Sequence, residues 1–350
     1  MLKYKILYIC NEDKATTLHR LMALETIGAS TFVIYHTKIN SSESLLLRIL
    51  KYLVFKITKI RLDNNNENKQ ILNVIQANSF DLFFIEKGLT IKRSTLLKIK
   101  LLFPKAVVLH YCLDDHMNPH YLTKRFLETV PIYDVMYTNK NFNVSELLIL
   151  GAKRVKYFRN GYSDHFHRKL DINNEGIDEY SSSVTFIGSF EKARAEILFG
   201  IAQLGIKVDI WGWGREEIEF KHDNLNFKDR HIFGYEFTRV IQSSKINLCF
   251  LRKENRDRET TRSVEIPACG GFMLAERTTE HIELFTEGIH AVYFNDINEL
   301  AEKVNYYLNS EEERVGIARQ GYDRCRELKL GYESQIRSII EYCKKLNDDK

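Results

Sequence analysis

The chain contains little of what marks disordered or membrane-embedded proteins. Only 4 of its 350 residues are proline and it holds no low-complexity tract, so no long disordered segment is expected. No apolar run reaches the roughly 18 residues that a membrane-spanning helix needs. The apolar part of the N-terminal sequence MLKYKILYIC is too short for a signal peptide and instead predicts a first β-strand.

Paired cysteines and a strong charge of one sign are also missing. The cysteines are scattered without a CxxC pair and most lie in apolar runs, which is typical of buried, reduced thiols. We therefore expect a cytoplasmic protein without structural zinc. The net charge of +4 is too small to indicate nucleic acid as a partner. The cysteines are Cys10, Cys112, Cys249, Cys269, Cys325 and Cys343.

Two common nucleotide-binding motifs are absent as well. No GxGxxG follows the first predicted strand, and neither GxxxxGKS nor GxxxxGKT occurs in the chain. The glycines and lysine of these motifs hold the phosphates of a dinucleotide or a nucleoside triphosphate. We therefore expect neither a dinucleotide-dependent dehydrogenase nor a P-loop enzyme.

What the chain does contain is a set of unbroken apolar segments that alternate with helical ones, in two similar halves. In the first half, strands are expected at 5–10, 31–35, 81–85 and 106–112, with a helix at about 17–27. In the second half, strands are expected at 184–188, 208–211, 246–251, 272–275 and 291–294, with a helix at about 193–204. Strands without polar alternation, separated by helices, predict parallel sheets covered on both faces.

A polar, turn-rich stretch, residues 159–183, connects the halves. It predicts an N-terminal domain at 1–165, a C-terminal domain at 180–330 and a long last helix at about 332–346. The expected fold class is α/β, with two Rossmann-like domains facing each other across a cleft. Ligands of such folds bind at the carboxyl ends of the strands.

The sequence TTRSVEIPACGGFMLAERTTEH places hydroxyls and an arginine before a double glycine. Thr260, Thr261 and Ser263 suit a helix start, and the two glycines suit its end. A helix N-terminus has unpaired N–H groups and a positive dipole end, which suit a phosphate. Arg262 would add a cation, and Glu265 would accept two hydroxyls of a sugar ring. The alternative is an ordinary capped helix.

Two more segments of the second half are candidates for the same ligand. In GSFEKARAE, Gly188 and Ser189 allow a close backbone approach, and Lys192 or Arg194 would reach phosphates. The alternative for both cations is a solvated helix face. In FGYE, Tyr235 is our candidate for contact with a nucleobase, although buried aromatic residues usually belong to a core.

The sequence HYCLDDHMN places three polar residues directly after a buried strand of the first half. Asp114, Asp115 and His116 would then lie at the carboxyl end of the sheet, where a carboxylate can act as general base on an acceptor hydroxyl. The alternative is a turn capped by an Asp side chain. Lys87 ends another strand and would line the same site. Because no His/Cys cluster accompanies these residues, a metal is not expected.

The segment INLCFLRKENRDRETTRSVEIPACGGFMLAERTTEHIELFTEG resembles the donor-binding segment of GT-B glycosyltransferases, specifically the CgeB-like (spore-maturation-protein-like) group. TTLHRLMALETIGA, DLFFIEKG and LDDHMN are similar to landmarks of that group's N-terminal half. The resemblance implies a GT-B fold, no metal requirement, a last helix that packs back on the first domain, and Arg20 on the acceptor side. It also implies an acidic pair separated by seven residues. Here that pair is Asp257 and Glu265, which departs from the usual Glu at the first position and gives Glu265 the nucleotide ribose.

One basic and apolar segment bears on where in the cell the protein is located. Residues 45–62, from Leu45 to Leu62 (LLLRILKYLVFKITKIRL), carry five cations and no acid among bulky apolar residues. Such a segment would lie on an anionic membrane surface and bring the protein to a lipid-linked acceptor. The alternative, which the pattern favours slightly, is a core helix with a basic outer face.

Together these features predict a cytoplasmic glycosyltransferase of the hexosyltransferase type, with peripheral membrane contact as an option. It would move a sugar from a nucleotide-diphosphate sugar to a hydroxyl on a glycan or lipid-linked glycan, in bacterial surface glycan assembly, without a cofactor. Two alternatives stay open. A sugar-nucleotide epimerase of the same architecture would need no acceptor groove, and a non-catalytic nucleotide-sugar-binding subunit would show no turnover.

Overall fold

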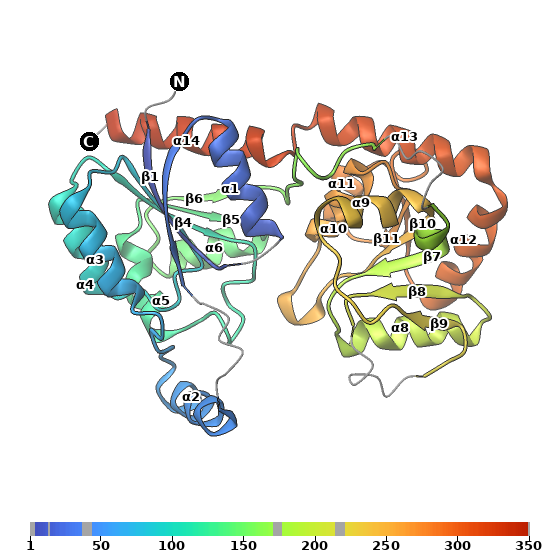
Figure 1. Ribbon diagram of the computed structural model, residues 1–350, viewed down its shortest axis with the longest axis horizontal. Coiled ribbons are helices and arrows are strands. Elements are labelled where there is room, and N and C mark those ends of the chain that lie inside the picture. Colours follow the sequence, from blue (N-terminus) through green and yellow to red (C-terminus); the bar gives the residue numbers. More distant parts are fainter. Residues whose placement is uncertain (1–3, 13–14, 37–43, 171–176, 214–220, 349–350) are drawn as a thin grey trace. The chain divides into compact units, whose positions relative to one another are not determined.

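The computed structural model describes residues 4–12, 15–36, 44–170, 177–213 and 221–348. The chain divides into two compact units, which are described separately (Figure 1). Unit 1 contains Met1–Arg159 and Glu333–Lys350, and unit 2 contains Asn160–Tyr332. Unit 2 is therefore inserted into unit 1 along the chain.

Unit 1 is built on a six-stranded sheet in the order β2-β1-β3-β4-β5-β6, and every neighbouring pair is parallel. The strands are β1 (Lys5–Cys10), β2 (Ser30–Tyr35), β3 (Leu82–Glu86), β4 (Val107–Cys112), β5 (Val135–Thr138) and β6 (Val155–Tyr157). All residues of β3 and β4 are buried, because helices cover both faces of the sheet.

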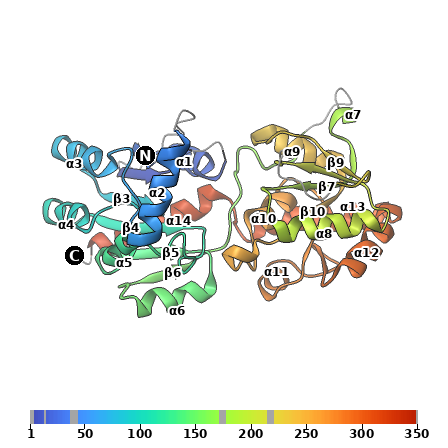
Figure 2. The ribbon, with the colours of Figure 1, turned by 90° about the horizontal axis from the view of Figure 1, so that it is seen from below.

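The helices of unit 1 connect these strands and, apart from α2, flank the sheet (Figure 2). They are α1 (Thr16–Thr26), α2 (Leu45–Thr58), α3 (Glu67–Ala77), α4 (Arg93–Leu102), α5 (Lys124–Thr129), the short 3-10 helix η1 (Val130–Ile132), α6 (Asn141–Ile149) and α14 (Tyr332–Asp348).

Helix α14 returns from the end of unit 2 and packs on unit 1. The Asn347 amide donates to the Tyr4 hydroxyl at 3.0 Å, and the Gln335 amide donates to the backbone carbonyl of Arg159 at 3.2 Å. Ile336, Ile340 and Cys343 on the same helix are buried. The last helix thus supplies part of the core of the first unit.

Unit 2 has a second six-stranded parallel sheet, in the order β12-β11-β10-β7-β8-β9. Its strands are β7 (Ser182–Ile187), β8 (Val208–Trp211), β9 (Leu225–Phe227), β10 (Ser244–Cys249), β11 (Met273–Glu276) and β12 (Val292–Phe294). Its helices are α7 (Ile177–Tyr180), α8 (Lys192–Gln203), α9 (Gly234–Ser243), the short 3-10 helix η3 (Lys253–Asn255), α10 (Thr261–Ala268), α11 (Thr279–Leu284), α12 (Ile297–Asn309) and α13 (Glu311–Glu327).

The predicted fold class, α/β with two Rossmann-like domains, is confirmed by these sheets. Every predicted strand is present within two residues of its expected ends. All six cysteines are buried and none forms a disulfide, as the scattered pattern predicted. Among the helices of the described residues, none combines the length and the apolar character that crossing a membrane requires.

Candidate functional site

Each sheet reverses its strand order at one place, and this place locates a crevice for a ligand. In unit 2 the chain starts at β7, builds β8 and β9 on one side, then returns to add β10 on the other. The loops that follow β7 and β10 therefore leave in opposite directions, and in open α/β sheets such a switch point is where a ligand crevice lies, at the carboxyl ends of the strands. In unit 1 the corresponding place lies between β1 and β3.

Helix α10 begins beside the unit 2 crevice, as the hydroxyl-rich sequence predicted. Thr260 is its N-cap residue, and the chain leaves the helix at Gly270, whose φ of +81° is a conformation that favours glycine. The side chains of Thr260 and Thr261 are half-buried. The Thr260 hydroxyl accepts from the backbone N–H of Ser263 in a capping box, whereas the Thr261 hydroxyl has no hydrogen bond within the part of the chain that the structure describes. The Thr261 hydroxyl is available to a ligand together with the remaining N-terminal amides, and the Thr260 hydroxyl keeps its own proton to donate.

Arg262 and Glu265, expected to serve the diphosphate and the ribose separately, form an ion pair. The Glu265 carboxylate is only 2% exposed, whereas the Arg262 side chain is 29% exposed. The Arg262 guanidinium also donates from Nε to the carbonyl of Ile187 at the end of β7, at 3.1 Å, and lies 4.5 Å from the centre of the Phe237 ring. The pair therefore stands at the crevice as a single unit, with its cation facing outward.

Ser263 does not offer its hydroxyl to a ligand, which corrects the prediction. Its Oγ accepts from the backbone N–H of Thr260 at 3.0 Å and lies 2.7 Å from Nε2 of His281. His281 donates from Nδ1 to the carbonyl of Glu276, so Nε2 accepts the Ser263 proton. Ser263 is fully buried. It fastens α10 to the end of β11, and His281, which the sequence did not single out, is its partner.

Arg194 is also a structural residue, contrary to the expectation that it reaches a phosphate. Its guanidinium donates to the carbonyls of Phe250 at 3.0 Å and Leu251 at 3.4 Å, after β10, and to that of Ser189 at 3.2 Å, after β7. It joins the two loops that form the crevice. Burial lowers its pKa below the ordinary value. Gly188 lies under this joint, where a Cβ would come within 2.8 Å of the Phe186 ring.

The other predicted donor residues lie around this crevice or near it. Lys192 and Ser189 are exposed, at the start of α8 and in the loop before it. Tyr235, half-buried in the first turn of α9, has its hydroxyl 2.9 Å from Nε2 of His165. The Asp257 carboxylate accepts from the Asn255 amide at 2.6 Å and from the backbone N–H of Arg252 at 3.3 Å. Asp257 therefore holds the turn before α10.

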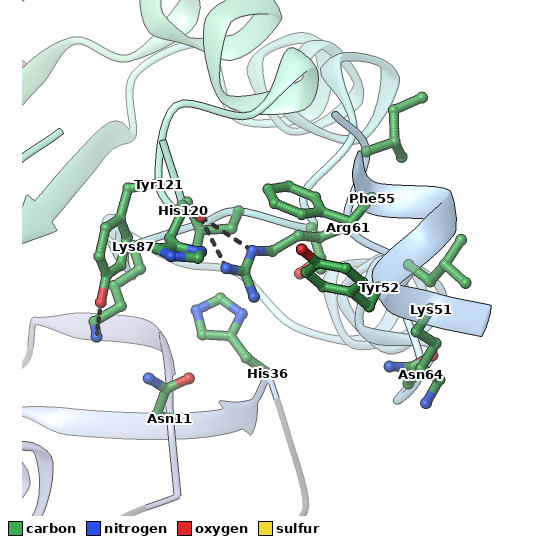
Figure 3. A pocket seen from close by; sticks show the side chains of 14 residues that line it. Asn11, His36, Lys51, Tyr52, Phe55, Arg61, Asn64, Lys87, His120 and Tyr121 are labelled. Carbon is green, nitrogen blue, oxygen red and sulfur yellow. Dashed lines mark hydrogen bonds between the residues drawn. The ribbon is translucent and has the colours of Figure 1, made fainter. Parts of the chain in front are cut away.

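A pocket of about 510 Å³ lies at the switch point of unit 1 (Figure 3). Asn11 follows β1, His36 follows β2 and Lys87 follows β3, so the carboxyl ends of three strands converge on it. Its other side is formed by His120 and Tyr121 after β4, and by Lys51, Tyr52, Phe55 and Arg61 in or after α2. None of the described residues that line it is an Asp or a Glu.

The structure brings together two residues that were predicted for different roles, Lys87 and Asp114. Lys87 Nζ lies 2.7 Å from the Asp114 carboxylate and 3.5 Å from the Tyr121 hydroxyl. Burial alone would lower the pKa of Lys87, but the charges of Asp114 and its neighbours raise it instead. Burial raises the pKa of Tyr121 to about 12. The pocket wall therefore holds a charged lysine, a carboxylate behind it and a neutral phenol.

Asp115 and His116 point elsewhere and are used by the fold, which corrects their catalytic assignment. The Asp115 carboxylate accepts from the backbone N–H of Met117 and from the Asn143 amide, both at 2.9 Å. The His116 ring contacts the rings of His110 and Phe126 at tilted angles, and its Nδ1 lies 3.2 Å from the Asn143 carbonyl oxygen. Burial lowers the pKa of His116 to about 4, so the imidazole is neutral.

Arg20 is likewise not an exposed acceptor residue. Its guanidinium pairs with Glu86 at the end of β3, with Nη2 2.8 Å from the carboxylate, and the Tyr8 hydroxyl contacts the same carboxylate. Arg20 is 2% exposed. The pair anchors α1 to β1 and β3, beside the switch point, and so positions the base of the pocket.

The comparisons with known proteins agree with this arrangement. Residues 194–341 match the family model described as Glycosyl transferase-like. The glycosyl transferase-like region covers less than half of the chain but contains α10, its ion pair and the loop after β10. No curated protein sequence matched the chain.

Solved structures of the GT-B fold match nearly the whole chain. A glycosyltransferase from Rickettsia africae is 12% identical, with 100% of both chains covered and a TM-score of 0.68. HepE of Anabaena, solved with UDP-glucose, is 13% identical, with 97% of this chain and 99% of that chain covered and a TM-score of 0.62. A Listeria monocytogenes protein assigned as a UDP-N-acetylglucosamine 2-epimerase is 12% identical, covers 97% and 98%, and has a TM-score of 0.55. At these identities the similarity shows the fold.

Proposed function

We propose that the protein transfers a sugar from a nucleotide-diphosphate sugar to a hydroxyl acceptor. The observation that carries this proposal is the start of α10, where two threonine hydroxyls, N-terminal amides and an outward-facing arginine meet at the switch point of a glycosyl transferase-like region. A nucleotide diphosphate is the leaving group of such a transfer, and these groups suit its growing negative charge. The CgeB-like group remains our assignment within that class.

On the donor side, Thr260, Thr261 and Arg262 would hold the diphosphate. Glu265 would accept the ribose hydroxyls through the carboxylate oxygen that does not pair with Arg262, and Lys192 would add a second cation from α8. Tyr235 is proposed to contact the base. HepE, a structural neighbour, is solved with UDP-glucose, so a uridine nucleotide is the first donor to test.

On the acceptor side, we place the hydroxyl in the pocket of unit 1. Of the three predicted catalytic residues, Asp114 is the one whose carboxylate contacts a pocket-lining side chain, Lys87. Asp114 would take the proton of the hydroxyl as its oxygen bonds to the anomeric carbon and the bond to the diphosphate breaks. We propose that the acceptor is a glycan or lipid-linked glycan of the bacterial surface, that the sugar is a hexose, and that the protein acts in the cytoplasm without a metal.

The donor assignment is tested by thermal shift with UDP, GDP, ADP and dTDP. A nucleotide that binds only the folded state raises the melting temperature. We expect Thr261→Val to weaken binding of the preferred nucleotide about tenfold, because it removes one hydrogen bond to a charged group. The matched control is Thr286→Val, an exposed threonine of the same unit. Equal affinities in both variants would remove α10 from the donor site.

The epimerase alternative has a specific observation in its favour, the fold similarity to the Listeria protein. Incubation with the donor alone separates the classes. Epimerised donor would establish the alternative, whereas slow hydrolysis and transfer to an added hydroxyl would support the proposal. Asp114→Asn is expected to lower transfer about a hundredfold while nucleotide affinity is unchanged. Binding with no turnover of any kind would indicate a non-catalytic subunit.

A further inference from the structure

Helix α2 carries an apolar face that none of the described residues of unit 1 covers. Leu46 and Ile57 are 80% and 81% exposed, and Leu50 between them is 56% exposed. Ile49 and Leu53 belong to the same face, at 47% and 46%. Their spacing of three, four, seven and eleven residues from Leu46 places all five on one side of the helix. A helix that served the core would bury this side.

The opposite side of α2 is the one that faces the protein. Lys51, Tyr52 and Phe55 line the pocket of unit 1, and the Arg61 guanidinium lies 5.1 Å from the centre of the Phe55 ring. Figure 1 shows α2 standing away from the sheet of its unit, and Figure 3 shows Tyr52 and Phe55 directed from α2 toward Arg61. The expectation of a core helix with a basic outer face is therefore wrong. The apolar stripe is turned outward.

The charges of this segment are of one sign. From 45 to 62 the sequence contains Arg48, Lys51, Lys56, Lys59 and Arg61 and no acidic residue. Lys51 and Arg61 line the pocket, whereas Lys56 and Lys59 are exposed. An exposed apolar stripe with cations at its borders complements a surface that is anionic outside and apolar a few ångströms deeper.

A second copy of the chain fits this face less well. A stable interface uses about 20–30 residues on each side, and this face offers five apolar side chains. A symmetric pairing of two α2 helices would also bring their basic borders together, which is unfavourable. A bilayer needs no large complementary surface, and its anionic headgroups attract the basic borders instead of repelling them.

We propose that α2 is an in-plane anchor that docks unit 1 on a bilayer containing anionic phospholipid, with Leu46, Ile49, Leu50, Leu53 and Ile57 inserted between the headgroups. This inference goes beyond the proposed function and does not depend on it. If both hold, the pocket on the inner side of α2 lies next to the headgroups, where a lipid-linked acceptor is presented.

The test is co-sedimentation of the full chain with vesicles of phosphatidylcholine alone and of equal parts phosphatidylcholine and phosphatidylglycerol. We expect at least about tenfold tighter binding to the anionic vesicles at low salt, and weaker binding as salt rises. Leu50→Glu with Leu53→Glu should abolish the binding. The matched control is Leu97→Glu with Leu101→Glu, which alters two exposed leucines of α4 in the same unit.

A second pair, Lys56→Glu with Lys59→Glu, should remove the preference for anionic vesicles while the melting temperature stays unchanged. The proposal is overturned if the wild-type chain does not sediment with anionic vesicles at low salt, or if the α2 and α4 variants bind equally. It is also overturned if the wild type is a dimer in solution that the α2 variant dissociates, because the face then belongs to a second copy. Nucleotide binding, which we propose for unit 2, reports separately on the proposed function.

Discussion

The Arg262–Glu265 pair shows how one residue's role depends on its neighbour. The Glu265 carboxylate is nearly inaccessible, and Arg262 compensates its charge while also binding the carbonyl of Ile187. A buried carboxylate that loses its cation is costly, whereas a half-exposed arginine that loses its carboxylate is still solvated. The two substitutions should therefore differ in their effect on stability as well as on binding.

We expect Arg262→Ala to lower the free energy of unfolding by about 2–3 kcal/mol, because it leaves Glu265 buried without its partner. Glu265→Gln should cost less, and Arg262→Met combined with Glu265→Gln should recover much of the loss. Urea unfolding of the three variants measures this coupling. Additive effects would show that the pair does not act as a unit.

His116 gives a residue-scale prediction about pH. Burial lowers its pKa to about 4 in the folded protein, and the unfolded chain has the ordinary value near 6.5. The neutral form is favoured in the fold, so its stabilisation is complete above pH 6.5 and is lost as pH falls toward 4. The shift corresponds to roughly 3 kcal/mol.

His116→Gln should therefore flatten the decline of the unfolding free energy between pH 7 and pH 4. His110, whose pKa burial also lowers, leaves a remaining slope. His120→Gln, which changes an exposed imidazole, is the control. A variant with the slope of the wild type would contradict the neutral, buried assignment.

The sequence could suggest which residue types gather near the ligand but not what each one contacts. Asp114 and Asp115 are adjacent, yet one turns to Lys87 and the other to Asn143, because successive side chains in a turn point in different directions. In the sequence, Ser263 resembles a phosphate-binding hydroxyl. In the structure, its hydroxyl donates to His281, which lies eighteen positions later. Such partners are distant in sequence, so no local pattern identifies them.

At the scale of elements, α10 depends on one serine. Ser263 caps the N-terminal amide of Thr260 and satisfies the buried Nε2 of His281. We expect Ser263→Ala to cost about 2 kcal/mol, since it removes a cap and leaves a buried acceptor unpaired.

Thermal unfolding of Ser263→Ala compared with Thr261→Ala checks this expectation. Both substitutions remove a hydroxyl from the first turn of α10, but the Thr261 hydroxyl has no hydrogen bond within the described part of the chain. Equal melting temperatures would show that the Ser263–His281 contact does not stabilise the helix.

Most strands could be predicted because long apolar runs leave no other interpretation, as KILYIC and VVLHYC show. The strands that were missed are β5, β6 and β9, which have four, three and three residues. In β6 and β9, at the sheet edges, exposed residues interrupt the apolar pattern. The outward face of α2 was missed for another reason. Its periodicity gives the width of the apolar stripe but not the side on which the protein lies.

At the scale of the whole molecule, α14 ties the end of the chain to its beginning. We expect truncation after Tyr332 to destabilise unit 1, because Ile336, Ile340 and Cys343 leave its core and Tyr4 loses its contact with Asn347. Unit 2 keeps all of its own strands and should still bind nucleotide.

Calorimetry of the truncated chain with and without nucleotide measures both effects. The expected result is a lower first transition that nucleotide does not change, and a second transition that nucleotide still raises. Loss of nucleotide binding together with α14 would show that unit 2 depends on the returning helix.

The insertion of unit 2 into unit 1 also sets an order of events at the ribosome. Unit 1 lacks α14 until roughly 170 further residues have been made, which takes about 10–30 s at ordinary rates of synthesis. Unit 2 is complete before then, and the bridge between Tyr162 and Gly331 joins segments near its beginning and its end. The unit that is begun first is therefore finished last. Throughout that interval, the part of the unit 1 core that α14 covers is exposed in the nascent chain.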